Sequence, residues 1–590
     1  MKVGPVFFDH LYSEKIPKRH FGARPENGVR YWLLPLLLLL LFGFLFLRLV
    51  FLQIIQGAYY HKLSDSNRIK SIPIHAPRGV IFDRNGKPLV INAPGYRQVM
   101  NGTTKFISSS DAVSLLTKND PSLEIDSLRM YPCGLSCAHV VGYVGQISPN
   151  NLKNPLFEGY RPTDVIGKMG AEQYYEPILK GIDGAKLIEV DATGKQLRIL
   201  GQTDPTPGQN ITLTIDEDMQ KTVALAMKDV KKGAAIVSKP DGEILALYSS
   251  PSFDPNLFTM GKNYATTPDS VYQTVEQILL DGSYQPLLDR AISGTYPPGS
   301  TFKLVVAAAA LQNNIIDQNF SVEDNGILKV GNFSFANWYF TDYGKTEGEV
   351  NVVKAIQRSN DIFFYKVGQM VGVDKLSGFA KEFGLGTPLG IDLVGEAGGL
   401  LPTKEWKQKV IGDQWYLGDD YHYGIGQGYL LTTPLQVNMW TQVIANGGSL
   451  YLPHILSSLP TTVKQEHLLT TENTNLIRQG MIEACDTGGV AWPLFNFQVQ
   501  NPKSQLTIDG KDFYQPENAS SSAAVGVRVA CKTGTAQHGS DTTLPDAWIT
   551  AYAPAYHPQV VVTVLAEDSG EGSNVAGPVL KQILEKYFGK

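Results

Sequence analysis

The chain has 590 residues, of which 43% are hydrophobic and 18% charged, and its formal net charge is −5. This length exceeds one ordinary hydrophobic core, so we expect two or more folded units, and the composition excludes a disordered chain. The slightly acidic balance gives no support for a nucleic-acid partner, which would favour a basic face.

The four cysteines are too few for a disulfide framework. Cys133 and Cys137 are close enough in sequence to pair within a turn, whereas Cys485 and Cys531 are far apart. The sequence leaves the redox state of both pairs open. Four buried or free thiols are the simpler interpretation.

A charge-free apolar run extends from Tyr31 to Leu47 and continues as LVFLQII after Arg48. About twenty such residues cross a bilayer as a helix. A cleaved signal peptide would have a shorter apolar core and a small-residue cleavage site, so an uncleaved anchor at 31–55 is favoured. The tail at 1–30 is rich in basic residues, which predicts that it stays in the cytoplasm and that everything after the anchor lies outside.

The region after the anchor reads as short strands and helices. They are expected near 71–91, 108–111, 167–181 and 183–200. The first of these contains Asp83-Arg84-Asn85-Gly86, whose Asn-Gly pair indicates a hairpin turn. Residues 202–209, QTDPTPGQ, form a Pro/Gly/Thr-rich joint. We therefore expect a non-catalytic, mostly β pedestal domain at 56–209 and a second domain at 210–590.

The second domain combines strands at both of its chain ends with helices between them. A strand and helix are expected at 211–230, a hairpin at 233–251, three strands at 530–536, 546–554 and 559–568, and a closing amphipathic helix at 577–589. An antiparallel sheet flanked by helices is an α+β fold.

Ser300-Thr301-Phe302-Lys303 precedes an apolar helix in this domain. Ser and Lys three residues apart share one face of a helix. A partly desolvated lysine can lose its proton and act as a base toward the serine hydroxyl. Backbone N–H groups at a helix start can also stabilise the oxyanion of an acyl-transfer intermediate.

Ser359-Asn360-Asp361 is a second short motif. A second hydroxyl near a Ser–Lys pair can relay a proton to a leaving group. Ser359 and Asn360 could equally form a local helix cap.

Lys532-Thr533-Gly534-Thr535 is the third motif, on a predicted strand. Gly534 would let substrate backbone come close to the strand edge. Lys532, Thr533 and Thr535 would supply donors for a substrate carboxylate, and the N–H of Thr535 could complete an oxyanion hole.

Each motif alone has a simpler explanation. A Ser-x-x-Lys match occurs by chance in a chain this long, helix N-capping would account for Ser300, and Lys-Thr-Gly is an ordinary strand-end tripeptide. The order of the three motifs, their spacings of roughly sixty and about 170 residues, and their helix and strand contexts make the combination specific for acyl transfer.

The motif set resembles that of penicillin-binding proteins and serine β-lactamases. PRGVIFDRNGKPL at 77–89 and GKMGAEQYY at 167–175 resemble the membrane-proximal segments of class B penicillin-binding proteins. YPPGSTFK, LPTKEWKQK, YGIGQGYLLTTPLQ and the 546–548 strand resemble the penicillin-binding protein 2 branch, which acts in side-wall elongation. Asp361 also favours that branch, because division enzymes usually carry Asn there.

The resemblance implies a role for each motif residue in a serine D,D-transpeptidase. Ser300 would be acylated by the penultimate D-Ala of a stem pentapeptide, Lys303 would deprotonate it, and Ser359 would pass the proton on. Asp361 would shape that corner, and the substrate carboxylate would be held by the third motif, Lys532, Thr533, Gly534 and Thr535. An amine from a second stem peptide would then attack the acyl-enzyme, whereas β-lactams would acylate the same serine and persist.

The resemblance also sets expectations about partners and cofactors. No glycosyltransferase domain precedes residue 210, so glycan polymerisation is expected from a SEDS-type, RodA-like partner among the membrane proteins of the elongation complex. Some relatives are thought to hold a metal near the active site, but this chain has no His or Cys between Ser300 and Asp361, which predicts no metal and no cofactor. The segment at 92–130 is shorter than the usual head subdomain, which leaves regulation through it open.

Three other functions compete with an elongation transpeptidase in the bacterial inner membrane. A division-type transpeptidase would share the chemistry, but the QGYLLTTP and PTKEWKQK segments argue against it. A β-lactam sensor or scaffold would need a cytoplasmic output domain, and thirty residues are too few for one. A β-lactamase would need a deacylating base, and none is evident. The amine donor, the β-lactam affinities and the activating partners are not encoded in a readable pattern.

Overall fold

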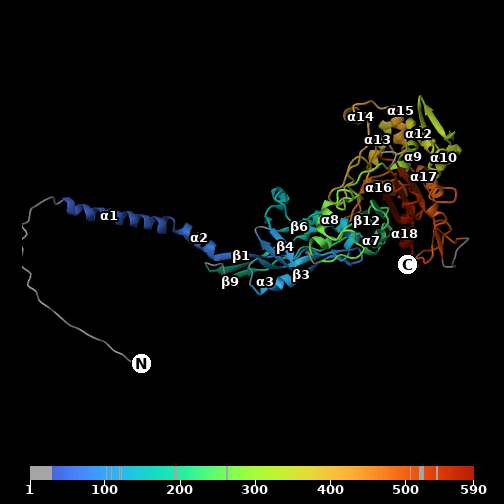
Figure 1. The fold of residues 1–590 in the computed structure, drawn as a ribbon. Helices are drawn as coiled ribbons and strands as arrows, with labels where there is room; N and C mark the ends of the chain where they lie inside the picture. The colour runs from blue at the N-terminus through green and yellow to red at the C-terminus, as the bar shows by residue number, and fades with distance from the viewer. Residues whose placement is uncertain are drawn as a thin grey trace, which may run out of the picture. The chain divides into compact units, whose positions relative to one another are not determined.

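The computed structural model describes residues 29–100, 103–107, 109–118, 120, 122–191, 196–260, 264–504, 506–516, 524–539 and 543–590. Most of the predicted cytoplasmic tail lies outside the described residues. The chain divides into two compact units (Figure 1). One contains residues 1–74 and 185–203, and the other contains residues 75–184 and 204–590.

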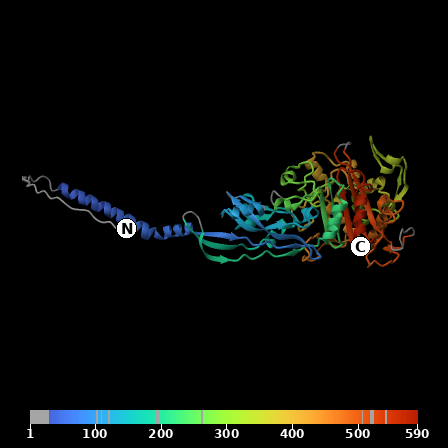
Figure 2. The same cartoon turned by 60° about the horizontal axis from the view of Figure 1, so that its bottom comes forward.

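The first unit contains the predicted apolar helix. It comprises α1 (Val29–Val50), one π-helical turn (Phe51–Ile55) and α2 (Gly57–Arg68). Its 24-residue stretch Trp32–Ile55 has a mean hydropathy of 2.7 and is long and apolar enough to cross a membrane. The extended chain after it forms the three-stranded sheet that Figure 2 shows, in the order β1 (Ile69–Ile74), β8 (Gly184–Val190) and β9 (Gln196–Thr203).

The pedestal part of the second unit is built on a five-stranded sheet. Its strands are β2 (Ile81–Phe82), β3 (Pro88–Met100), β4 (Thr103–Ile107), β5 (Leu123–Met130) and β10 (Ile211–Thr212). The predicted hairpin turn is confirmed, because Gly86 has a φ of +82° and its N–H donates to the Asp83 carbonyl at 3.1 Å. The predicted helix start near residue 108 becomes α3 (Ser109–Leu116).

Two local predictions in this region were wrong in detail. The helix expected at 167–181 is divided into α5 (Gly170–Tyr174) and α6 (Glu176–Leu179). Pro177 lies in the first turn of α6, where its missing N–H costs nothing, but it cannot continue α5. The strand expected after residue 210 shortens to β10, which pairs in parallel with β2 of the pedestal sheet.

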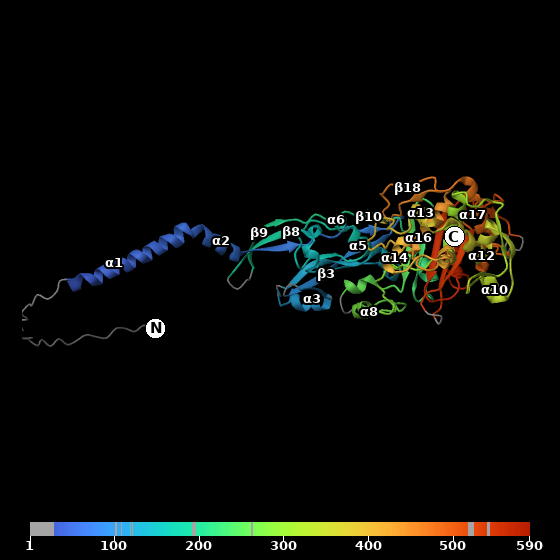
Figure 3. The ribbon, with the colours of Figure 1, turned by 90° about the horizontal axis from the view of Figure 1, so that it is seen from above.

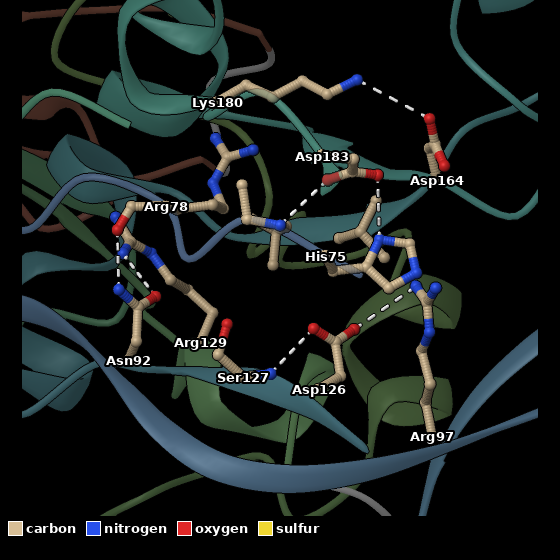
Figure 4. A pocket seen from close by; sticks show the side chains of 13 residues that line it. His75, Arg78, Asn92, Arg97, Asp126, Ser127, Arg129, Asp164, Lys180 and Asp183 are labelled. Carbon is tan, nitrogen blue, oxygen red and sulfur yellow. Dashed lines mark hydrogen bonds and ion pairs between the residues drawn. The ribbon is translucent and has the colours of Figure 1, made fainter. Parts of the chain in front are cut away.

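A small polar cavity of about 60 Å³ lies in the pedestal, and Arg78 and Arg129 are among the charged residues that line it (Figure 4). Arg78 lies 2.7 Å from Glu172 and 2.8 Å from Glu176, and Arg129 also pairs with Glu172. Burial would raise the pKa of Glu172, but Arg129 and Arg78 hold it below its usual value. Because removing one partner would leave a buried charge uncompensated, this network fixes the pedestal strands to α5 and α6.

Further short elements complete the pedestal: β6 (Val144–Gln146), β7 (Val165–Gly167) and α4 (Ala138–Val141).

The domain that contains the three motifs, predicted at 210–590, is organised around a five-stranded antiparallel sheet. Its order is β12 (Ile244–Ser250), β11 (Gly233–Ser238), β24 (Val560–Ala566), β23 (Asp546–Ala553) and β22 (Ala530–Ala536). The predicted hairpin and the three C-terminal strands are therefore confirmed. β22 is the edge strand, so one of its sides is left for other parts of the chain.

Helices cover both faces of this sheet (Figures 1 and 3). Alternate strand side chains divide between two cores: Ile236 packs in the core that contains α9 (Lys303–Gln312) and α16 (Pro434–Ala445), and Val237 packs in the core that contains α7 (Glu217–Ala226) and α18 (Ala576–Phe588). The predicted α+β class is confirmed. The other helices of the domain are α8 (Val275–Leu280), α10 (Trp338–Tyr343), α11 (Val352–Gln357), α12 (Asp361–Val371), α13 (Val373–Glu382), α14 (Lys404–Val410), α15 (Leu417–Gly424) and α17 (Thr471–Ala484).

Smaller strand pairs lie outside the main sheet. They are β13 (Ser321–Asp324) with β16 (Gly348–Asn351), β14 (Ile327–Val330) with β15 (Phe333–Ala336), β17 (Leu450–Tyr451) with β18 (Val463–Gln465), and the group of β19 (Gln498–Val499), β20 (Phe513–Tyr514) and β21 (Val525–Val527). The first two pairs are formed by the chain segment that connects α9 to α11.

The simpler interpretation, in which all four cysteines are thiols, is wrong for one pair. Cys485 and Cys531 form a disulfide across 46 residues of sequence, which joins the end of α17 to β22. Cys133 and Cys137 are buried free cysteines. Burial, with Cys137 beside it, raises the pKa of the Cys133 thiol well above its usual value.

Candidate active site

Ser300 lies in a single 3-10 turn, Gly299–Phe302, that leads into α9. Gly299 has a φ of +54°, and its N–H donates to the Gly426 carbonyl at 3.0 Å. A Cβ at Gly426 would lie 2.1 Å from the Gly299 carbonyl oxygen, so only glycine permits this contact. The Trp548 indole N–H holds the preceding Pro297 carbonyl at 3.0 Å. No side-chain cap is present at this turn, so the capping explanation for Ser300 is wrong.

Lys303 follows one turn later and is completely buried. Its Nζ donates to the Asp361 carboxylate at 2.7 Å, to the Ser359 carbonyl at 2.8 Å and to Ser359 Oγ at 3.4 Å. Burial lowers the pKa of Lys303, and the Asp361 carboxylate partly offsets that effect. Sequence spacing suggested a direct Ser300–Lys303 pair, whereas the hydrogen bonds of this ammonium among the described residues go to the second motif.

The second motif occupies the turn between α11 and α12. Asn360 caps α12, because its side-chain oxygen accepts from the Phe363 N–H at 2.9 Å. The capping interpretation is therefore confirmed for Asn360, whereas Ser359 faces the lysines. Ser359 has a φ of +53°, a left-handed conformation that is unfavourable for a residue with a side chain.

Lys532 reaches the same serine from β22. Its Nζ donates to Ser359 Oγ at 2.8 Å and to the Thr533 carbonyl at 2.9 Å, and the residue is fully buried. Burial, with the neighbouring Lys303 charge, holds the pKa of Lys532 well below its usual value. The Ser359 hydroxyl thus lies between two lysines whose protonated forms are both disfavoured by burial, which suits it to proton relay.

The edge of β22 lies against the Ser300 turn. A Cβ at Gly534 would lie 3.0 Å from both Thr301 Cγ2 and Trp548 Cβ, and a Cβ at Gly299 would lie 3.0 Å from the Thr535 carbonyl. A side chain at Gly534 would therefore meet the Ser300 turn and β23, and the approach of substrate to Gly534 stays a prediction. Thr535 is exposed, whereas Thr533 is buried.

Sequence reasoning missed Asn337 and Trp338, which hold Asp361. The Asp361 N–H donates to Asn337 Oδ1 at 3.1 Å, and the Trp338 N–H donates to Asp361 Oδ2 at 3.0 Å. Neither residue belongs to a recognisable motif. Gly426 lies in the YGIGQG segment that supported the resemblance, but no role was predicted for it.

Two sequence families match the chain. The penicillin binding protein transpeptidase domain matches residues 233–585, and the penicillin-binding protein dimerisation domain matches residues 121–213. The first match includes all three motifs.

Full-length relatives and solved structures agree with these matches. The peptidoglycan D,D-transpeptidase MrdA of Haemophilus influenzae is 32% identical over 93% of this chain and 90% of its own length. The complex of penicillin-binding protein PBP2 and MreC from Helicobacter pylori superposes with a TM-score of 0.70 at 27% identity, over 88% of this chain and 99% of that one. A chain from a peptidoglycan synthase complex that coordinates polymerization and crosslinking covers 95% of this chain and 99% of its own, with a TM-score of 0.67 at 27% identity.

Proposed function

This chain belongs to the penicillin-binding protein transpeptidases, and we propose that it is a peptidoglycan D,D-transpeptidase in which Ser300 is the acylated nucleophile. The observation that carries this proposal is the convergence of Lys303 and Lys532 on Ser359 beside the Ser300 turn. Two buried lysines joined through one hydroxyl provide acceptors and donors for proton transfer.

Acylation begins with attack of Ser300 Oγ on the penultimate D-Ala carbonyl. Lys303 accepts the serine proton in its neutral form, which burial favours. The proton passes through Ser359 to the departing D-Ala amine. The amine of a second stem peptide then attacks the ester, which restores the Ser300 hydroxyl and completes the cross-link.

Substrate charge is held at the third motif. The exposed Thr535 and the Nζ hydrogens of Lys532 supply donors for the terminal carboxylate, and Thr533 lies between them on β22. The backbone N–H groups of Ser300 and Thr535 supply the oxyanion hole, because the strand passes directly against the turn. Asp361 lies 2.7 Å from Lys303, which supports a role in holding that lysine in position.

The cellular role that fits best is cell elongation at the inner membrane. The apolar helix Trp32–Ile55 serves as a single-pass anchor with the catalytic domain outside. A structural relative was solved with MreC, and another in a synthase complex that couples polymerization to crosslinking. We therefore propose a MreC-like partner and a RodA-like polymerase for this chain.

Two measurements test the reaction and the role. Wild-type protein should release D-Ala from a stem pentapeptide and join the product to an amine acceptor, and Ser300→Ala should do neither. Depleting the protein from cells should then produce rounding. Filamentation on depletion would instead assign the enzyme to division, and D-Ala release by Ser300→Ala would remove Ser300 as the nucleophile.

A further inference from the structure

Asp324 lies outside the three motifs, at the end of β13, and its carboxylate joins four separate segments. Oδ2 accepts from the side-chain amides of Asn360 at 2.7 Å and Asn337 at 2.8 Å, and from the Glu347 N–H at 3.2 Å. Oδ1 accepts from the Gly326 N–H at 2.7 Å. The side chain is 1% exposed. A buried carboxylate with four donors is a rigid junction, because any movement of the carboxylate would leave all four donors without an acceptor at once.

Two of these donors lead directly to the catalytic motif. Asn360 separates Ser359 from Asp361 and is itself fully buried. Asn337 receives the Asp361 N–H on its oxygen while it donates its amide to Asp324. Asp324 is therefore connected to Asp361 through both Asn360 and Asn337 without contacting it.

The conformation of Ser359 explains why such a junction is needed. A left-handed serine persists only where surrounding contacts hold it. In this conformation the Ser359 carbonyl accepts from Lys303 at 2.8 Å and the hydroxyl accepts from Lys532 at 2.8 Å. A relaxed Ser359 would lose both alignments at once.

We propose that Asp324 is the positioning residue that keeps Ser359 and Asp361 aligned with the two active-site lysines. It acts through Asn337 and Asn360 and touches neither the substrate nor Ser300. This inference rests on the proposed acyl-transfer function.

The test compares Asp324→Asn with wild type in the full membrane-anchored chain, using fluorescent penicillin as the probe. The new amide has only one accepting atom, its oxygen, and therefore cannot accept from all four donors. The acylation rate constant should fall about 10- to 100-fold, as expected for misplaced catalytic groups. The ascending limb of the pH–rate profile should also move to lower pH. Asp361 would hold the Lys303 charge less well, and burial would then lower the Lys303 pKa further.

An exchange variant provides the rescue. Asp324→Asn combined with Asn337→Asp exchanges the carboxylate and the amide between the two positions. The hydrogen bond between the two side chains is then kept, with residue 324 donating and residue 337 accepting. The double variant should recover most of the lost rate and return the pH limb toward that of wild type. If Asp324→Asn does not fold, Asn337→Ser removes one link to Asp361 and should show the same two effects.

A matched control separates positioning from general stability. Asp392 is 4% exposed and accepts from the N–H groups of Ile455 and Leu456 at 2.7 and 2.9 Å. Asp392→Asn should lower the Tm and leave the pH profile unchanged. A wild-type rate and pH profile in Asp324→Asn, or the same changes in Asp392→Asn, would overturn the proposal. Loss of labelling in Ser300→Ala would still uphold the nucleophile, so the two proposals fail separately.

Discussion

Lys303 and Asp361 form an ion pair, with Nζ 2.7 Å from Oδ1, in which the lysine is fully buried and the carboxylate is 13% exposed. Two opposing effects therefore act on one ammonium. Burial favours its neutral, basic form, and Asp361 favours its charged form. Under the proposed mechanism, in which Lys303 accepts the Ser300 proton, the balance between them sets the pH range of acylation.

Asp361→Asn should shift this balance in a predictable direction. Without the carboxylate, burial acts alone and lowers the pKa of Lys303 further below its usual value. A larger fraction of Lys303 is then neutral at any given pH, so the ascending limb of the pH–rate profile for penicillin acylation should move to lower pH. The plateau should fall, because the Trp338 N–H loses its charged acceptor. A limb that stays in place or moves to higher pH would show that Asp361 does not control this lysine.

Gly534→Ala should slow acylation by disturbing the Ser300 turn. The added Cβ would lie 3.0 Å from Thr301 Cγ2 and Trp548 Cβ, and 3.1 Å from the Pro298 carbonyl oxygen. Overpacking of this kind costs about 1–3 kcal/mol, so the free energy of unfolding should fall by that amount and the acylation rate should fall with it.

Gly378→Ala is the matched control for this substitution. Gly378 lies within α13, and a Cβ there would meet nothing within 4 Å. The variant should gain up to about 1 kcal/mol of stability from helix propensity and acylate at the wild-type rate. Equal rates in the Gly534 and Gly378 variants would show that β22 does not need to lie this close to the turn.

The Cys485–Cys531 disulfide should stabilise the domain. It closes 46 residues of sequence, and a loop of this length contributes about 2–4 kcal/mol by restricting the unfolded chain. Replacing both cysteines with alanine should lower the free energy of urea unfolding by that amount, and reductant should do the same to wild type. The double variant is its own control, since reductant should leave it unchanged. Wild type that is insensitive to reductant would contradict the disulfide.

The sequence predicted the parts of the site that depend on local patterns. Strands β22, β23 and β24 follow from short apolar runs between turn residues, and α9 follows from the apolar run after Lys303. The three motifs were recognisable because their residue types and spacing carry the chemistry.

What the sequence could not predict depends on contacts between distant segments. Nothing local indicates that Lys303 bonds to Asp361, 58 residues away, or that Lys532 reaches Ser359 across 173 residues. Asp324 is one aspartate in a mixed polar segment, and its four donors come together only when β13, α10 and α12 are placed. The disulfide was missed for the same reason.

Mass spectrometry of the intact protein with a β-lactam can show whether Ser300 carries the acyl group. Wild type should gain the mass of one β-lactam, and peptide mapping should place it on Ser300, whereas Ser300→Ala should stay unmodified and keep its Tm. A β-lactam adduct on Ser300→Ala, or an adduct mapped to another residue in wild type, would show that Ser300 is not the nucleophile.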